Sequence, residues 1–288
     1  MEDNIMKMLA LGSVVLSSML AVPSFAEDIK GIRTFDFHDG GNVLCIQDAA
    51  MRLPQNLFTD TGSGHRRQAD SYESSVNVFL VRRQGKKMLV DAGNDPSRGS
   101  LRGKLLQAGI HPDEISDIFI THIHPDHVGG LLWEEKPLFP KAAVHIAREE
   151  LEAWRKDGSR SRLAKYLDPY EARIHSFEYG KELPGGFCPE KRAGHTPGHT
   201  IFRMPLGEGK EAVFIGDIVH AADLQFPYPT FCARFDMVPG EAVASRTETL
   251  RMQGLLFGAH IPFPGVAQGG VVAKGAPDWS FIFRKAEE

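Results

Sequence analysis

The sequence predicts an α/β protein built from two mixed β-sheets that are covered by helices. Short runs of β-forming residues alternate with segments of helical periodicity along the 288-residue chain. Several strand runs follow one another directly, such as 76–83 and 86–93, which are joined by the glycine-containing turn QGKK. Strands and helices that are interleaved in this way, with hairpins between some strands, favour two mixed sheets over one doubly wound parallel sheet.

The expected strands share apolar or alternating patterns: 32–37, 42–47, 76–83, 86–93, 116–121, 142–147, 172–177, 200–205, 211–216, 255–260, and two final strands in 270–275 and 279–284. Helical periodicity predicts helices over 100–110, 148–158 and 239–254, and the last two end at glycines. Residues 49–75 read as a long polar loop, a length that often carries function.

The N-terminus has the pattern of a secretory signal. Met8–Val22 is an apolar run that follows Lys7 and precedes the small residues Ser24 and Ala26. The run is short for a membrane span, although an uncleaved anchor or an N-terminal helix is the alternative. We therefore expect cleavage after Ala26, a periplasmic or secreted protein, and no stable membrane insertion. The acidic residues ahead of Met6 leave open which methionine starts the chain.

Neither a linker nor a repeat divides the remaining chain, so we expect a single domain over residues 27–288. The 33 basic and 37 acidic residues give a net charge of −4, which offers no basis for a nucleic-acid partner. Cys45, Cys188 and Cys232 are widely spaced and odd in number, which is typical of small buried residues. One disulfide and a homodimer both stay open.

Three histidines and an aspartate lie within six residues of the stretch THIHPDHVGG (121–130). His122 and His124 are two residues apart, so in an extended segment both side chains point the same way. Pro125 then turns the chain, and Asp126 and His127 can face a second direction. Two adjacent groups of ligands suit two metal ions about 3.5–4 Å apart. The alternative is a polar surface loop, which so many ligand-type side chains disfavour.

Ligand-type residues also end later strand runs, in AGHTPGHT, FIGDIVH and LLFGAH. These motifs contribute His195 or His199, then Asp217, then His260. A carboxylate at a strand end, such as Asp217, can bridge two cations through its two oxygens. Each motif is a weak signal alone, because a single histidine after a strand is more often structural. Together with the first cluster they predict one set of seven ligands.

The order of these motifs after VDAG (90–93) resembles the metallo-β-lactamase-fold hydrolases, over about residues 30–285. The resemblance implies an αββα sandwich with a dinuclear metal site at one edge. Family members that host a di-iron redox centre carry glutamate where His124 stands, so this histidine argues against a redox protein. Within the family, the motifs look closest to the exported branch that includes methyl parathion hydrolase and lactone-cleaving enzymes.

The resemblance also assigns the ligands by position. The implied sets are His122, His124 and His195 for one ion and Asp126, His127 and His260 for the other, with Asp217 bridging. It places Asp91 and His199 outside the ligand set, where Asp91 would brace the HxHxDH loop by hydrogen bonds. Imidazoles and carboxylates suit two divalent ions, most of all zinc, while manganese, iron and cobalt could use the same donors.

The expected reaction is hydrolysis of a small apolar substrate. A hydroxide that bridges the two ions would attack a lactone or ester carbonyl, and phosphotriester cleavage would be a side activity. Asp217 as the bridge and Asp126 as a proton shuttle are the expected catalytic residues. A class B-type β-lactamase and an acylhomoserine lactonase are alternative enzymes. A periplasmic metal- or ligand-binding protein without turnover is the alternative outside catalysis.

The stretch HAADLQFPYPTFCARFD (220–236) is rich in aromatic residues and directly follows Asp217. Such a segment can form the wall of an apolar pocket for the substrate. The residues expected in this pocket are His220, Phe226, Tyr228, Phe231 and Phe235. The alternative is that these rings fill the space beneath a long loop. Leu57 and Phe58 could form a second wall.

Overall fold

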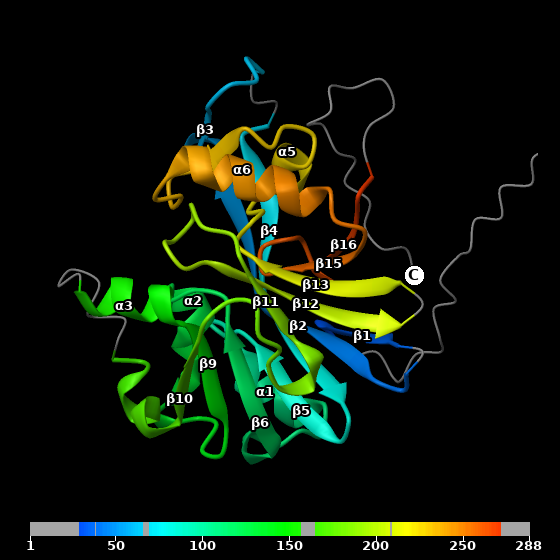
Figure 1. Cartoon of the computed structure of the whole chain (residues 1–288), viewed down its shortest axis with the longest axis vertical. Helices are drawn as coiled ribbons and strands as arrows, with labels where there is room; N and C mark the ends of the chain where they lie inside the picture. The colour runs from blue at the N-terminus through cyan, green and yellow to red at the C-terminus, as the bar shows by residue number, and fades with distance from the viewer. Residues whose placement is uncertain (1–28, 38, 66–68, 157–164, 208, 272–288) are drawn as a thin grey trace, which may run out of the picture.

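Two mixed β-sheets pack against each other, and helices cover their outer faces (Figure 1). The computed structural model describes residues 29–37, 39–65, 69–156, 165–207 and 209–271. The expected signal segment 1–26 lies outside these residues. Among the helices of the described ranges, none has both the length and the apolar character needed to cross a membrane.

The larger sheet has seven strands in the order β1-β2-β4-β5-β6-β9-β10. Its strands are β1 (Ile32–Asp36), β2 (Asn42–Pro54), β4 (Ser71–Arg83), β5 (Lys86–Val90), β6 (Ile115–Ile120), β9 (Ala143–Ala147) and β10 (Ile174–Phe177). Strands β1, β2, β4 and β5 pair antiparallel in that order, whereas β5, β6, β9 and β10 pair parallel. The sheet is therefore mixed, as the combination of hairpins and interleaved helices predicts.

The smaller sheet has five strands in the order β11-β12-β13-β15-β16. Its strands are β11 (Cys188–Lys191), β12 (Thr200–Gly207), β13 (Lys210–Gly216), β15 (Gly254–Gly258) and β16 (Val266–Gly269). Strands β13 and β15 are parallel and the other pairs are antiparallel. Two small ribbons pair β3 (Phe58–Asp60) with β14 (Phe231–Ala233) and β7 (Leu132–Trp133) with β8 (Lys136–Pro137).

Helices lie on the two outer faces of the sandwich (Figure 1). They are α1 (Leu101–Gln107), α2 (Pro125–Val128), α3 (Arg148–Lys156), α5 (Ala222–Gln225) and α6 (Pro239–Leu250). Apolar side chains of α1 and α3 share one buried cluster with the larger sheet. Residues of α5 and the end of α6 share another with the smaller sheet.

The core between the sheets is rich in aromatic side chains. Phe119 of the larger sheet lies 5.6 Å from Phe202 of the smaller one, measured between ring centroids, and Phe79 lies 5.7 Å from Phe214. All four rings are at most 2% exposed. Burial of each such side chain stabilises the fold by roughly 1.5–3 kcal/mol, so this layer holds the two sheets in a fixed relation.

Residues 49–75 do not form the long loop that the sequence predicts. Strand β2 continues to Pro54 and pairs with β4, whose first residue is Ser71. Leu53, Phe58 and Tyr72 are buried together in a separate apolar cluster beside β14. Only every second residue of the hairpin contributes an apolar side chain to this cluster, and the residues between them are polar and face outward. The sequence of the segment therefore looks polar overall, like that of a loop.

The other main predictions about the fold are confirmed by the architecture, which has the expected four layers of helix, sheet, sheet and helix. Cys45, Cys188 and Cys232 are free thiols, so no disulfide joins them. The two final strands expected in 270–275 and 279–284 extend beyond the described residues. Strand β16, at Val266–Gly269, occupies the edge of the smaller sheet instead.

Candidate metal centre

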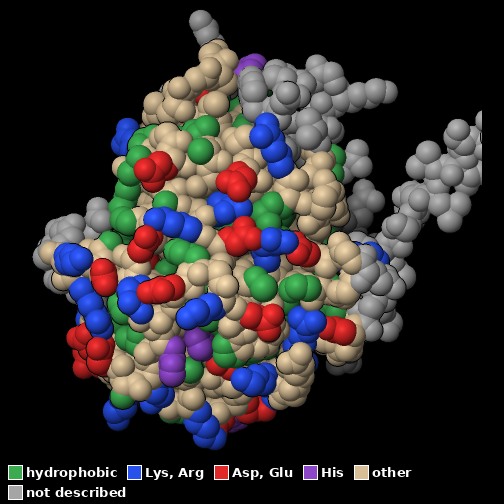
Figure 2. Space-filling model, viewed as in Figure 1, with side chains coloured by type: hydrophobic (Ala, Val, Ile, Leu, Met, Phe, Trp, Pro, Cys, Tyr) green, Lys and Arg blue, Asp and Glu red, His purple; other side chains and the backbone are tan. Residues whose placement is uncertain are grey.

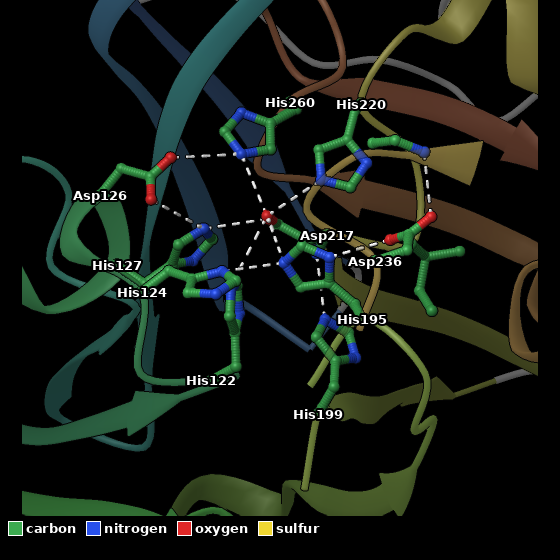
Figure 3. Close-up of polar contacts among 12 residues, drawn as sticks. His122, His124, Asp126, His127, His195, His199, Asp217, His220, Asp236 and His260 are labelled. Carbon is green, nitrogen blue, oxygen red and sulfur yellow. Dashed lines mark hydrogen bonds and ion pairs between the residues drawn. The ribbon is translucent and has the colours of Figure 1, made fainter. Parts of the chain in front are cut away.

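Four ligand-type side chains meet at one edge of the sandwich (Figure 3). Nδ1 of His124 lies 2.8 Å from Nε2 of His122 and 2.9 Å from Nε2 of His195. Oδ2 of Asp217 lies 3.1 Å from Nε2 of His195 and 3.6 Å from Nε2 of His122. We call these four residues the three-histidine group. Three imidazoles and one carboxylate make a donor set that suits a four-coordinate zinc ion.

A second group adjoins the first and shares Asp217 with it. Oδ1 of Asp217 lies 2.9 Å from Nε2 of His127, and Oδ2 lies 3.2 Å from Nε2 of His260. Asp126 completes this group, with Oδ2 at 3.4 Å from Nε2 of His260 and Oδ1 at 3.9 Å from Nε2 of His127. The two oxygens of Asp217 thus face both groups, which is the arrangement expected of a bridging carboxylate.

The strand ends explain why these residues converge. His122 follows β6, Asp217 follows β13 and His260 follows β15, while His195 lies between β11 and β12. Pro125 is the first residue of α2, where its missing N–H costs nothing and its fixed φ starts the turn. That turn separates His124 from Asp126 and directs them to different groups.

Gly216 allows the strand end to approach the centre closely. Its φ is +49°, and a Cβ there would lie 2.7 Å from Nε2 of His199 and 2.9 Å from the Thr121 side chain. A larger residue would therefore move either the strand that carries Asp217 or the loop that carries His122. The glycine of the GDIVH motif has a steric role beside the bridging carboxylate.

Asp91 braces the loop of the first motif. Its Oδ1 accepts a hydrogen bond from the Thr121 backbone N–H at 2.8 Å, and its Oδ2 accepts one from the Thr121 hydroxyl at 2.9 Å. Oδ2 also lies 2.8 Å from Nδ1 of His127. This last contact holds a proton on Nδ1 of His127, so Nε2 is the nitrogen that faces Asp217 and becomes available to a metal ion when it releases its own proton. The structure thus puts Asp91 in the bracing position that the sequence implies.

The ring nitrogens opposite the centre have similar partners in His195 and His260. Nδ1 of His195 lies 3.0 Å from Oδ1 of Asp236, and Nδ1 of His260 lies 2.7 Å from the carbonyl oxygen of Ser75. Oδ2 of Asp236 in turn accepts from the buried guanidinium of Arg246 at 3.2 Å. Each contact directs an Nε2 lone pair toward the centre, as second partners of metal-binding histidines do.

His199 lies beneath the centre and not in it. Its Nε2 accepts a hydrogen bond from the Asp217 backbone N–H at 3.1 Å, and its ring centroid is 5.8 Å from that of His195. Burial and the neighbouring His195 lower its pKa to about 3. His199 is therefore a neutral acceptor that fixes the backbone of Asp217, which agrees with its predicted place outside the ligand set.

Electrostatics divide the histidines into two kinds. Burial, together with the surrounding histidines, lowers the pKa of His122 well below its ordinary value and that of His124 to about 3. Burial also lowers the pKa of His127 and His260, but the carboxylates of Asp217 and Asp126 outweigh it. The pKa of His127 is raised well above its ordinary value, and that of His260 is raised to about 10. The same histidines hold the pKa of Asp217 well below its ordinary value despite burial.

Several buried polar atoms of the centre fit metal coordination better than hydrogen bonding. Nδ1 of His220 has no hydrogen-bond partner among the described residues, and Nε2 of His127 and Oδ1 of Asp217, although 2.9 Å apart, form no hydrogen bond of ordinary geometry. Buried polar atoms without partners cost free energy unless something binds them. A cation between Nε2 of His127 and Oδ1 of Asp217 would satisfy both atoms. The residues present therefore fit two divalent ions.

A cavity of about 250 Å³ opens onto the two groups. Its lining residues are Met51, Leu53, His124, Pro125, Asp126, His195, Asp217, His220, Phe235 and His260. One wall is thus apolar and comes from β2 and from the loop after β14, and the opposite wall holds the ligands. This volume lies just below the usual range for small-molecule sites, about 300–1,000 Å³, and so favours a small substrate.

The predicted pocket residues divide into two sets. His220 and Phe235 line the cavity. Phe226, Tyr228 and Phe231 do not: the rings of Phe226 and Phe231 are 1% exposed and pack in two apolar clusters, and Tyr228 packs at the edge of the second. The prediction is corrected here, because these rings fill the space beneath the segment that follows Asp217. Phe58 is fully buried with them and forms no second wall.

Sequence reasoning missed Met51, Leu53, Asp236 and Glu150. Met51 and Leu53 fall in the segment predicted as a loop, although their period-two spacing in AAMRLP is typical of a strand. Asp236 stands at the end of the aromatic stretch without any motif around it. Glu150 reads as one of three acids at the start of an amphipathic helix, yet it is fully buried.

Comparisons with solved structures agree with the architecture. A hydrolase named AbOPH, described as a member of the beta-lactamase superfamily, superimposes with a TM-score of 0.76 at 25% identity, covering 89% of this chain and 98% of that one. AidC, a dizinc quorum-quenching lactonase in complex with a product, gives a TM-score of 0.75 at 23% identity, with coverage of 85% and 95%.

Sequence relatives align over shorter regions. Ribonuclease TTHA0252 of Thermus thermophilus is 26% identical over 178 residues, which are 59% of this chain and 41% of the ribonuclease. Metallo-beta-lactamase domain-containing protein 1 of Mus musculus is 31% identical over 97 residues, or 34% of each protein. The chain thus spans less than half the length of these relatives.

The family model of the metallo-beta-lactamase superfamily matches residues 71–260, a range that contains every ligand of the two groups. This chain belongs to the metallo-beta-lactamase superfamily.

Proposed function

We propose that this protein is a dimetal hydrolase that cleaves a small, neutral lactone or ester. The observation that carries the proposal is the pair of ligand groups sharing Asp217 at the floor of a cavity with an apolar wall. Two bound divalent ions, zinc being the most suitable, would supply an acidified water and polarise the carbonyl oxygen of the substrate. The remaining chemistry belongs to residues of the chain.

Asp126 and His220 have places from which they can act on a substrate. Asp126 lines the cavity, and its pKa lies below the ordinary value, since burial is outweighed by His127 and by the hydrogen bond from His260. An ionised carboxylate there can accept a proton from water and pass it to the leaving oxygen. His220 lines the same cavity, with Nε2 at 3.3 Å from Oδ2 of Asp217 and Nδ1 free of hydrogen bonds among the described residues, so its ring can donate a hydrogen bond to a substrate oxygen.

The lining of the cavity favours neutral substrates over anionic ones. Among the described residues that line it, none is a lysine or arginine. Ribonucleic acid carries one negative charge per nucleotide and requires a basic groove. Lysine and arginine alternate with acidic side chains over the face shown in Figure 2 and form no basic stripe there. The ribonuclease activity of the Thermus relative is for these reasons not proposed for this chain.

The same lining disfavours β-lactams, because these antibiotics carry a carboxylate that needs a cationic partner. A lactone or ester with an apolar substituent has no such need, and Met51, Leu53 and Phe235 can contact that substituent. Acylhomoserine lactones belong to this neutral class. Aryl phosphotriesters are also neutral, and we propose them as slower, secondary substrates.

The test is a substrate panel on the metal-loaded protein. It contains aryl esters, γ- and δ-lactones with short and long alkyl chains, an aryl phosphotriester and a chromogenic β-lactam. We expect the highest kcat/KM for a lactone or ester and loss of activity on chelation. Two bound metals without hydrolysis of any substrate would instead favour a binding protein, and a preference for the β-lactam would overturn the choice of substrate class.

A further inference from the structure

We propose that Glu150 is a positioning residue that holds the three-histidine group together by joining the two loops that carry its histidines. The inference rests on the metal centre of the proposed function. Glu150 belongs to α3, and its side chain is fully buried. Its hydrogen bonds go to residues beside the ligands and not to the ligand side chains themselves. A buried carboxylate needs strong partners, and the identity of these partners is what assigns the role.

The two carboxylate oxygens face different loops. Oε1 accepts a hydrogen bond from the backbone N–H of Ile123 at 2.9 Å, and this residue lies between His122 and His124. Oε2 accepts from the hydroxyl of Thr196 at 2.8 Å and from the backbone N–H of Gly198 at 2.9 Å. Thr196 directly follows His195 in sequence. One side chain therefore fixes the backbone beside all three histidines of the group.

Two further contacts show that the site is built for this carboxylate. The indole Nε1 of Trp154 donates to Oε1 at 2.6 Å, and the Trp154 ring lies 5.5 Å from the ring of His124, edge to face. A Cβ on Gly198 would lie 2.3 Å from the backbone nitrogen of Glu150. Only glycine lets the second loop approach α3 closely enough for its N–H to reach Oε2.

All four partners of Glu150 are donors, so the group must accept at both oxygens. Glutamine has the same shape but replaces one oxygen by an NH₂ group, which would face the donors of one loop or the other. Either orientation leaves that loop without its anchor. Groups that orient metal ligands typically change metal affinity by about 10–100-fold when they are replaced. We expect a loss in this range for Glu150→Gln, confined to the three-histidine group.

The experiment measures cobalt binding rather than turnover. Metal-free protein is titrated with Co²⁺, and the visible d–d absorption bands report the geometry at each ion. Asp126→Ala, a change in the second group alone, provides a background in which the three-histidine group is read by itself. In this background Glu150→Gln should weaken Co²⁺ binding by about 10–100-fold and change the d–d spectrum.

Asp48→Asn is the matched control. Asp48 is also a buried carboxylate, and it accepts four hydrogen bonds, from the N–H and side chain of Asn94 and from the N–H groups of Ser100 and Leu101. These partners lie in the loop before α1 and at the first residue of that helix, and none of them is a ligand. Asp48→Asn should lower the melting temperature as Glu150→Gln does, while Co²⁺ affinity and spectrum stay within twofold of the parent.

The possible results distinguish a failure of the metal centre from a failure of the role of Glu150. If the unmodified protein binds no Co²⁺, the metal centre and the proposed function fail together. If it binds two ions and Glu150→Gln retains the parental affinity and spectrum, only the role of Glu150 fails, and equal losses in Glu150→Gln and Asp48→Asn also overturn it. Should Glu150→Gln not fold, Thr196→Val removes one donor of the same set and should weaken Co²⁺ binding several-fold; an unchanged affinity would refute the role.

Discussion

Replacement of Asp236 by asparagine should weaken both the fold and the metal centre, for different reasons. The Asp236 side chain is fully buried between Nδ1 of His195, at 3.0 Å, and the guanidinium of Arg246, at 3.2 Å. Asparagine preserves the shape but removes the charge. Arg246 is 1% exposed and keeps its hydrogen bonds to the carbonyl oxygens of Ile218, Pro229 and Phe231, yet no other acidic side chain forms an ion pair with it in the described residues.

The stability cost follows from the unpaired cation. Breaking a buried ion pair on one side costs about 3–5 kcal/mol. In a domain of this size each kcal/mol lowers the melting temperature by roughly 2–4 °C, so Asp236→Asn should melt roughly 6–20 °C lower. The effect on the metal is separate: without the carboxylate, His195 loses the partner that orients its Nε2. Metal affinity of the three-histidine group should fall by about 10–100-fold.

The assay uses metal-free protein for melting, since bound metal would itself stabilise the fold, and chelator competition for affinity. Asp117→Asn is the control, because Oδ1 of Asp117 lies 2.9 Å from Nε2 of His145 in a similar buried pair that contains no ligand. The control should lose stability and keep its metal affinity. A melting temperature of Asp236→Asn within 2 °C of the parent, or equal metal losses in both variants, would refute the reasoning.

His195→Ala should lose the ion of the three-histidine group, whereas His199→Ala should weaken the binding of that ion only moderately. Metal analysis after dialysis distinguishes the two variants, and equal losses of metal would contradict the assignment of His195 as a ligand and His199 as its neighbour. Phe235→Ala should raise KM for long-chain esters more than for short ones, by roughly tenfold for two lost methylene contacts; a uniform change would contradict the pocket. Burial raises the pKa of Asp117, but His145, Ser116 and Lys86 lower it to about 2 from 3.8. The ionised Asp117 side chain should therefore contribute about 1–2 kcal/mol to the free energy of unfolding after screening. This contribution should be present above pH 3.8, disappear toward pH 2 and be missing from Asp117→Asn at neutral pH. If the free energy of unfolding of the variant depended on pH as that of the parent does, the prediction would be wrong. Exported protein should begin at Glu27 on N-terminal sequencing, and an intact Met1 or Met6 would reject the signal.

The sequence patterns predict most of the fold because its central strands are buried and apolar. The run SDIFIT is such a strand, and its end places His122 at the sheet edge. The β2–β4 hairpin was missed because one face of it is exposed and polar, so that Leu53 and Tyr72 stand isolated among charged residues. Such a strand is stabilised by partners distant in sequence, here Phe58 and Phe231, which no local pattern reveals.

The site divides in the same way. Ligands can be predicted because metal chemistry demands particular side chains at close spacing, as in His122, His124 and His127. The residues that orient them cannot, since any buried acceptor at the correct place will serve. Asp236 contacts His195, which is 41 residues away in sequence, and Glu150 accepts a hydrogen bond from Gly198, which is 48 residues away. In the sequence both acids look like ordinary surface acids. The apolar wall of the cavity cannot be predicted either, because Met51 reaches the cavity from β2, a strand far from the ligand motifs in sequence that pairs with β4.

The charges of the metal-free centre also imply that metal affinity rises with pH. Burial lowers the pKa of His260, but Asp217 and Asp126 raise it to about 10, and Asp217 and Asp91 likewise raise that of His127 despite its burial. Both imidazoles are therefore protonated at neutral pH in the absence of metal, and each must release its proton to bind an ion. Affinity at the group of Asp126, His127 and His260 should increase by up to about tenfold per pH unit for each proton released between pH 6 and 9. The three-histidine group should depend less steeply on pH, because His122 and His124 are already neutral and only the pKa of His195 is raised, its burial being outweighed by Asp217 and Asp236. Calorimetric titration in buffers of different ionisation enthalpy counts the protons directly, and an affinity that is independent of pH at both groups would contradict this account of the centre.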